Sequence, residues 1–274
     1  MSIHIIGAGR LASALCRTFR EQVATVISRR ESEAREVALL AGPNTDSGSR
    51  FDAACLEEGD TVWLAVPDDQ IEPVSALLAD SSLPGNLLCI HSAGALGLSA
   101  LSPLEAKTST AALHPNLVVL GDKSLPVSAL WGSTFAASLT ERIARLLRPI
   151  DPRLLTIDEA VRVDYHLAAT FAANYPVLLA SIAFRLYERA AVSSEESHEL
   201  VSGYLQSVIG SISASERPIK KITGPAKRKD VTTLRAHLTA IESLDGESGR
   251  LLLEALIDGV QRESEGGSDD EPGR

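Results

Sequence analysis

Residues 2–12 read Ser2-Ile-His-Ile-Ile-Gly7-Ala-Gly9-Arg-Leu-Ala12, a short apolar run followed at once by the pattern Gly-x-Gly-x-x-Ala. The apolar run predicts a buried strand, and the pattern after it predicts a turn that opens a helix. Gly7 permits the tight turn, Gly9 lets backbone approach a pyrophosphate, and Ala12 lets the helix pack closely on the strand. A glycine-rich turn that binds nothing is the alternative. The predicted cofactor contacts here are Gly7, Gly9, Arg10 and Leu11.

Strand and helix signals alternate from this motif to residue 158. Strands are predicted over residues 2–6, 23–28, 61–66, 86–91, 109–113 and 133–137, and the first two helices over 11–19 and 31–40. Continuous apolar runs such as Val62-Trp-Leu-Ala-Val66 are typical of parallel strands that are buried on both faces. We therefore predict an α/β fold, with a doubly wound and mostly parallel sheet over residues 1–158.

After Asp158 the signals change to helices without intervening strands. Helices are predicted over residues 159–189, from Ser193 onward with a serine cap, over 231–241 with Asp230 as cap, and over 249–260. This predicts an all-α domain over residues 159–262, with Pro176 bending its first helix. Residues 263–274 hold five acids, one arginine and no apolar side chain, so we expect a disordered tail.

The composition excludes several classes of protein. With 274 residues, of which 45% are hydrophobic and 23% charged, the chain is too apolar to be disordered as a whole. A net charge of −10 disfavours nonspecific nucleic-acid binding. The three cysteines form no Cys-x-x-Cys pair, which excludes a disulfide framework or a zinc ribbon, and no metal site is predicted. The N-terminus has no basic region before its apolar run, so we expect a strand, no signal peptide, and a cytoplasmic protein.

One stretch requires a decision between a buried helix and a membrane span. The 18 residues from Leu167 to Phe184 carry no charge. They include Asn174, Pro176 and six alanines, which keeps their hydrophobicity modest. This composition favours a helix buried inside the protein and no membrane contact, with a span as the alternative.

The end of the second predicted strand indicates which dinucleotide is bound. An NAD site usually has an acidic residue there, whereas this chain has Ser28-Arg29-Arg30. Arginines can hold a 2′-phosphate through charge-assisted hydrogen bonds, with the serine as a further donor. NADP(H) is therefore the predicted cofactor. The alternative is that both arginines only pair with Glu31 or Glu33 at the surface.

Three further segments follow predicted strands and are expected at the same carboxyl edge of the sheet. Val66 and Pro67 come first and are predicted to border the cofactor, while Asp68 and Asp69 are equally suited to begin a helix. His91-Ser92-Ala93-Gly94 and His114-Pro115 end later strands. Either histidine could polarise or protonate a carbonyl, and either could instead make a structural hydrogen bond.

Two polar groups in the helical part are candidates for the substrate site. His166, Thr170 and Asn174 share one face of the long helix among apolar neighbours and need partners, either a substrate or another helix. A basic run from Lys220 to Lys229 is followed by Asp230 and His237, and it is either a solvated loop or an anion-binding loop.

Taken together, these motifs resemble a family of bacterial Rossmann-like oxidoreductases with a helical C-terminal domain, distant relatives of ketopantoate reductase and pyrroline-carboxylate reductase. The resemblance extends to about residue 260. It departs at Arg228-Lys229-Asp230, where the family usually has Arg-Gly-Asp, and at Asn116-Leu-Val-Val119, where it often has a longer polar stretch. Related reductases carry a lysine on the first long helix of the second domain, and the comparable face here offers His166 and Asn174 instead.

The sequence thus predicts an NADP-dependent oxidoreductase that transfers hydride between the nicotinamide and a small carbonyl or imine in a cleft between the domains. A nonenzymatic NADP-binding or sensor protein is the alternative. A homodimer that pairs through the long helix is expected. The predicted catalytic residues are His166, Asn174 and His114; the predicted cofactor contacts are Gly7, Gly9, Arg10, Leu11, Ser28, Arg29, Arg30, Val66 and Pro67; the predicted substrate contacts are Ser92, Gly94, Thr170, Arg228, Asp230 and His237.

Overall fold

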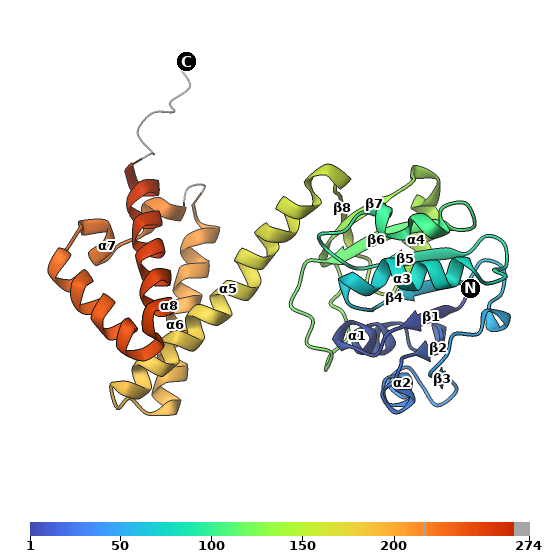
Figure 1. Ribbon diagram of the computed structural model, residues 1–274, viewed down its shortest axis with the longest axis horizontal. Helices are drawn as coiled ribbons and strands as arrows, with labels where there is room; N and C mark the ends of the chain where they lie inside the picture. Colours follow the sequence, from blue (N-terminus) through green and yellow to red (C-terminus); the bar gives the residue numbers. More distant parts are fainter. Residues whose placement is uncertain (216–217, 266–274) are drawn as a thin grey trace, which may run out of the picture. The chain divides into compact units, whose positions relative to one another are not determined.

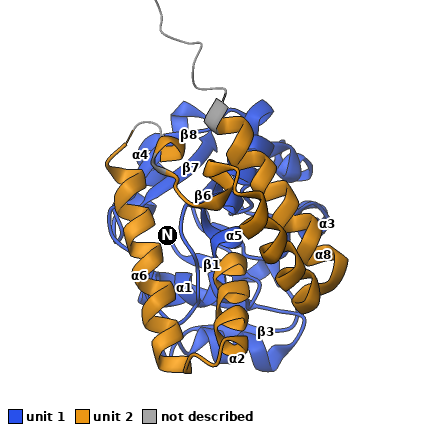
Figure 2. Cartoon of the chain, turned by 90° about the vertical axis from the view of Figure 1, so that its left-hand side faces the viewer, with its two compact units in different colours: residues 1–176 blue, residues 177–274 orange. Residues whose placement is uncertain are grey.

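The computed structural model describes residues 1–215 and 218–265. The chain forms two compact units, residues 1–176 and the residues from 177 onward (Figure 2). Helix α5 (Arg162–Arg189) begins in the first unit and ends in the second. The predicted domain boundary at residue 158 lies before this helix, whereas the units divide within it.

An eight-stranded sheet forms the first unit, with the order β3-β2-β1-β4-β5-β6-β7-β8 (Figure 1). Neighbouring strands are parallel except for the antiparallel pair β6 and β7. The doubly wound α/β fold predicted from the sequence is confirmed. The strands are β1 (Ile3–Ile6), β2 (Val23–Ile27), β3 (Asp46–Gly48), β4 (Thr61–Leu64), β5 (Leu88–His91), β6 (Ser109–Pro115), β7 (Leu130–Phe135) and β8 (Arg153–Thr156).

Helices cover both faces of this sheet, and each layer buries its own core. On one face, α1 (Arg10–Phe19), α2 (Glu31–Ala38) and α4 (Thr140–Leu147) pack on side chains such as Ile5 and Trp63. On the other face, α3 (Asp68–Ala79) and the 3₁₀ helix η3 (Leu98–Leu104) pack on side chains such as Val62 and Leu64. Burial on both faces accounts for the continuous apolar runs of the central strands.

Two strands were not predicted from the sequence, and one strand has an unexpected direction. β3 consists of Asp-Ser-Gly, residues of low strand propensity, and it forms because the free edge of β2 offers backbone partners. β8 adds an edge strand beside β7, and all four of its residues are exposed to solvent. β7 runs antiparallel to β6 because no helix connects the two strands.

The second unit is helical, with α6 (Ser194–Ser213), the 3₁₀ helix η6 (Pro218–Lys221), α7 (Pro225–Arg228) and α8 (Val231–Glu265) beside the end of α5. The predicted cap at Ser193 is confirmed, because its hydroxyl accepts a hydrogen bond from the Glu196 backbone in a capping box. The two helices predicted after Asp230 are joined in α8, across a kink at Gly246. The predicted tail begins at residue 263, but residues 263–265 form the last residues of α8. Residues 266–274 lie outside the described part of the chain.

Helix α5 contradicts the prediction of a buried helix. It is continuous through Pro176, yet its large apolar side chains are open, with Val163 and Val177 each 66% exposed and Phe171 60% exposed. Within the described residues, the segment 159–189 is the one helix long and apolar enough to cross a membrane, and none of its most apolar window is buried. The prediction was wrong because it placed the whole helix inside one helical domain, whereas α5 begins in the first unit and ends in the second.

Candidate functional site

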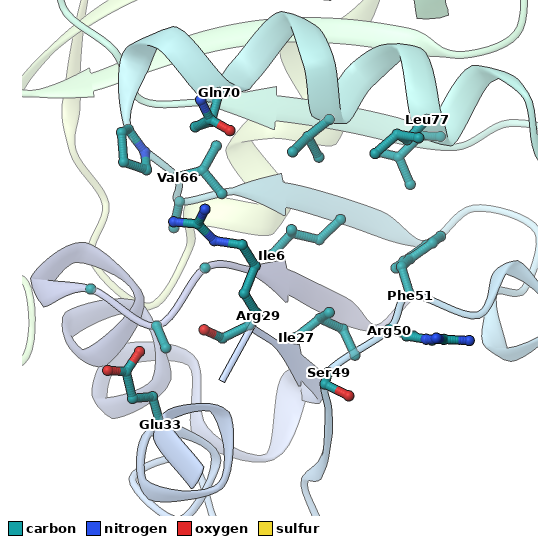
Figure 3. A pocket seen from close by; sticks show the side chains of 18 of the residues that line it. Ile6, Ile27, Arg29, Glu33, Ser49, Arg50, Phe51, Val66, Gln70 and Leu77 are labelled. Carbon is teal, nitrogen blue, oxygen red and sulfur yellow. The ribbon is translucent and has the colours of Figure 1, made fainter. Parts of the chain in front are cut away.

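A cavity of about 810 Å³ lies at the carboxyl ends of β1, β2 and β4 (Figure 3). The volume is typical of a site for a small molecule or cofactor. The cavity lies where the sheet order reverses between β1 and β4, which is where ligands bind in open α/β sheets. Its lining comes from the first turn, the end of β2, the segments after β3 and β4, and one side of α3 along its length.

The two motif glycines are required for different reasons. Gly7 has a φ of 123°, and a Cβ there would lie 2.1 Å from the carbonyl oxygen of Ala65. Its N–H donates to the Ile27 carbonyl at 2.7 Å, which fixes the turn against β2. Gly9 precedes α1, and a Cβ there would meet no described atom within 4 Å. The open space at the N-terminus of α1 therefore fits a pyrophosphate that approaches the backbone.

The structure separates the two arginines after β2. Arg29 lines the cavity, and Figure 3 shows its side chain extending toward the Val66 side. Arg30 does not belong to the described lining; its guanidinium pairs with the Glu33 carboxylate at 2.9 Å on the exposed surface of α2. Ser28 lines the cavity, as predicted. Sequence reasoning missed Arg50, which follows β3 and brings a second cation to the other end of the cavity (Figure 3).

The remaining predicted cofactor contacts are divided. Val66 and Pro67 line the cavity together with Gln70 of α3. Arg10 is exposed at the start of α1 and Leu11 is partly buried, and neither belongs to the described lining. Asp68 and Asp69 form the first turn of α3, where acids are favourable, and Pro67 is the N-cap.

A second cluster lies at the ends of β5 and β6 and the start of α5. It brings together predicted residues, namely Ser92, Gly94, His91, His114 and His166, with Asn116, Arg162 and Tyr165, which the sequence reasoning did not select. All of these residues belong to the first unit.

His91 is a structural histidine. Its Nε2–H donates to the Gly97 carbonyl at 2.9 Å, and its Nδ1 accepts from the Ala93 N–H at 3.2 Å. Burial lowers the pKa of His91 to about 4. The neutral ring therefore holds the turn after β5, and its neighbour Ser92 accepts from the indole N–H of Trp63 at 2.9 Å.

His114 faces the start of α5. Its Nδ1 lies 2.8 Å from the Tyr165 hydroxyl, and its ring meets that of His166 edge to face at 5.7 Å. Burial, followed by the charges of His166 and Arg162, lowers the pKa of His114 to about 4. At neutral pH the ring is uncharged, so it can accept a hydrogen bond but is a poor acid.

Gly94 allows the two histidines to approach each other. A Cβ on this residue would lie 2.4 Å from Cδ2 of His166 and 2.9 Å from Nε2 of His114. Asp68 faces the same region: burial raises the pKa of this carboxyl, and the nearby His166 opposes that shift. His166 therefore lies beside a neutral histidine and interacts electrostatically with a carboxyl group.

Arg162 is a buried cation that joins the cluster to strand β7 through hydrogen bonds. It is 1% exposed, and its guanidinium donates to the Thr134 hydroxyl at 2.7 Å and to the Gly94 carbonyl at 3.3 Å. Burial lowers the pKa of Arg162. An arginine at the start of a helix carries no sequence signal of burial, which is why the sequence did not reveal its role.

Farther along α5 the predicted polar stripe continues without reaching this cluster. Thr170 donates its hydroxyl proton to the His166 carbonyl at 3.0 Å within the helix, and Asn174 is exposed. Their predicted roles in substrate binding stay predictions.

The second unit contains three of the predicted substrate contacts, Arg228, Asp230 and His237. Asp230 caps α8 by accepting from the Thr233 N–H and hydroxyl at 3.1 and 2.8 Å, which confirms the predicted cap. Arg228 and His237 are exposed. Lys229 adopts a left-handed conformation with a φ of 56°, which glycine adopts more readily than lysine, and this explains the glycine usual in the resembling family. Among the described residues, no group of three His, Cys, Asp or Glu could hold a metal ion.

Comparison with known families divides the chain into two parts. Residues 2–93 match the family described as "NADP oxidoreductase coenzyme F420-dependent". Residues 132–252 match a domain of unknown function, DUF2520. These matches confirm the predicted resemblance to Rossmann-like oxidoreductases with a helical C-terminal domain, and they confirm NADP(H) as the cofactor of the matched oxidoreductase family. No curated protein matches the sequence significantly.

Solved structures with the same fold include several reductases. A candidate NADP oxidoreductase from Bacteroides fragilis is 19% identical, with a TM-score of 0.79 over 95% of this chain and 98% of that one. A reductive aminase from Aspergillus terreus, in complex with NADPH, is 17% identical, with a TM-score of 0.69 and coverage of 97% and 95%. A pyrroline-5-carboxylate reductase from Coxiella burnetii is 14% identical, with a TM-score of 0.54 and coverage of 96% and 97%. At these identities the similarity shows the fold.

Proposed function

Because the chain joins an NADP oxidoreductase domain to a DUF2520 domain, we propose that it is an NADPH-dependent reductase acting on a small carbonyl or imine. One observation carries this proposal: the cavity at the end of β1 combines the open N-terminus of α1 at Gly9 with the cationic side chain of Arg29. A dinucleotide phosphate needs both features.

The residues present fit NADPH. The backbone at Gly7 and Gly9 would hold the pyrophosphate, and Ser28 and Arg29 would hold the 2′-phosphate. Arg50 adds positive charge at the other end of the cavity. When bound, NADPH supplies the hydride, and the protein supplies binding, orientation and protons.

Reduction of a carbonyl or imine also requires a proton at the heteroatom. His114 is unsuited as the donor, because its pKa is lowered to about 4 and its ring is neutral. We assign the donor to His166, whose ring lies beside His114 at 5.7 Å and whose charge acts on the nearby Asp68 carboxyl. Asn174, two turns along the same helix, is proposed to orient the substrate.

The cofactor assignment is tested by titrating NADPH and NADH against the Arg29→Ala variant, with Arg30→Ala as the matched control. A charge-assisted contact worth roughly 1.5–3 kcal/mol predicts that NADPH binds about 10- to 100-fold more tightly than NADH. Arg29→Ala should remove most of this preference and Arg30→Ala little of it, because Arg30 is paired with Glu33. Equal affinities in the wild-type protein, or an unchanged preference in Arg29→Ala, would contradict the assignment.

Turnover is tested separately, by following oxidation of bound NADPH with a panel of carbonyls and imines. Oxidation by a member of the panel supports the reductase. Tight NADPH binding without oxidation by any of them would favour the alternative function, an NADP-binding sensor.

A further inference from the structure

Three side chains, those of His114, Tyr165 and Asn116, form a hydrogen-bonded chain that no predicted role explains. Tyr165 donates its hydroxyl proton to Oδ1 of Asn116 at 2.7 Å, and the Tyr165 hydroxyl oxygen lies 2.8 Å from Nδ1 of His114. The rings of Tyr165 and His114 meet edge to face, at 5.5 Å and 85°. The three residues come from α5, from the end of β6 and from the loop after it.

The position of Tyr165 is fixed by the sheet. A Cβ on Gly132 would lie 2.2 Å from the tyrosine oxygen, so the tyrosine depends on a glycine in β7. The Gly132 backbone acts to lower the pKa of Tyr165. Burial nevertheless raises the pKa of Tyr165, so the hydroxyl keeps its proton at neutral pH.

This arrangement determines where the imidazole proton lies. A tyrosine hydroxyl has one proton, and here that proton is donated to Asn116. The hydrogen bond between Tyr165 and His114 therefore needs its proton from the ring, on Nδ1. The other ring nitrogen, Nε2, is left with a lone pair, and it lies over Gly94 beside His166.

We propose that Tyr165 is a positioning residue that holds the proton of His114 on Nδ1, so that Nε2 accepts a hydrogen bond from an N–H group of the substrate. A protonated imine presents such an N–H, whereas a fully alkylated iminium does not. The preference for a substrate rests on the proposed reductase function, but the location of the proton does not.

Long-range ¹H–¹⁵N correlation spectra of the full-length labelled protein test this directly, because the shift of each ring nitrogen shows whether it carries a proton. His114→Gln identifies the His114 signals by their loss. We expect the proton on Nδ1 at pH 7 in the wild-type protein. In Tyr165→Phe the Nδ1 proton loses its acceptor, and the population with the proton on Nε2 should become the major one.

Tyr175→Phe is the matched control, because Tyr175 lies on the same helix and packs against Phe171 at 4.8 Å, away from His114. It should leave the His114 signals unchanged. Asn116→Leu is a second variant: without its acceptor, the Tyr165 proton turns to Nδ1 and the ring proton moves to Nε2. A wild-type His114 protonated on Nε2, or signals that do not change in Tyr165→Phe and Asn116→Leu, would overturn the proposal.

A second measurement tests the substrate preference. Once an imine is found that oxidises NADPH, its secondary form and its N-methyl iminium form are compared in the wild-type protein and in Tyr165→Phe. The wild-type protein should prefer the N–H form at least about tenfold in kcat/KM, and Tyr165→Phe should lose that preference. Equal preference in both proteins would contradict the acceptor role. Failure of NADPH to bind at all would instead contradict the proposed function and leave the spectra valid.

Discussion

Gly7 and Gly9 lie two residues apart, and their substitution should have different consequences. In Gly7→Ala the new methyl group would lie 2.1 Å from a backbone oxygen at a positive φ, so the turn must deform. We expect a loss of several degrees in melting temperature, or no folded protein. In Gly9→Ala the methyl group meets no described atom, so the melting temperature should stay within about 2 °C while NADPH binding weakens at least tenfold. Thermal melts and NADPH titrations of both variants test this, and a normal melting temperature in Gly7→Ala would contradict it.

Substitution of His166 should change turnover and leave cofactor binding almost unaffected. We predict that His166→Gln leaves NADPH affinity within about twofold and lowers turnover roughly 10²- to 10⁴-fold, the usual contribution of a positioned acid. The measurement is a steady-state assay on a substrate found by the panel. Lost folding or lost NADPH binding would show a structural histidine, and unchanged turnover would remove His166 from the mechanism.

The strand ends that carry His91 and His114 should make the first unit sensitive to acid. Both pKa values are lowered to about 4, so below about pH 6.5 the unfolded chain binds protons that the folded chain does not. The contribution of these histidines to the free energy of unfolding is therefore complete above pH 6.5. It falls as the pH drops toward 4, by up to about 1.4 kcal/mol per pH unit for each histidine. The pKa of Asp60 is also lowered, but its contribution is lost only below its ordinary value of 3.8.

Urea unfolding at several pH values between 7.5 and 4.5 measures this slope. His91→Gln should reduce it, because the amide can still donate to the Gly97 carbonyl without titrating. The exposed His237→Gln is the control and should leave the slope unchanged. A free energy of unfolding that does not vary between pH 6.5 and 4.5 would contradict the prediction.

At the level of elements, the sequence predicted what periodicity and turn chemistry encode. The first strand, the glycine turn and the caps at Ser193 and Asp230 are local signals, and each is found where it was predicted. Strand β3 was missed because its Asp-Ser-Gly sequence becomes a strand only beside β2. Similarly, the Tyr165 chain depends on Gly132 in a neighbouring strand, a proximity that no spacing along the sequence reveals.

At the level of the whole molecule, the open apolar surface of α5 favours association. The expected homodimer would cover side chains such as Val163 and Phe171, which are 66% and 60% exposed. Light scattering without detergent should give twice the chain mass of 29.1 kDa at micromolar concentration. Phe171→Arg should shift the mass toward the monomer, whereas Leu39→Arg, at a 64% exposed site after α2, should not. A wild-type mass of 29.1 kDa would reject the dimer.

The cofactor cavity is lined by residues between Ile6 and Ser81, all inside the part of the chain that matches the NADP oxidoreductase family. Arg162, Tyr165 and His166, by contrast, lie in the part that matches DUF2520. Under the proposed function, the reductant is therefore held by the N-terminal part of the chain alone, whereas the substrate is contacted by residues of both parts, since His114 lies before residue 132. On the same proposal, replacement of the segment after residue 130 is expected to change the substrate and to preserve cofactor binding, provided that the incoming segment keeps a glycine opposite the tyrosine and a partner for His114. Under the proposed function, such a fold can acquire new substrates while its NADPH-binding residues stay unchanged.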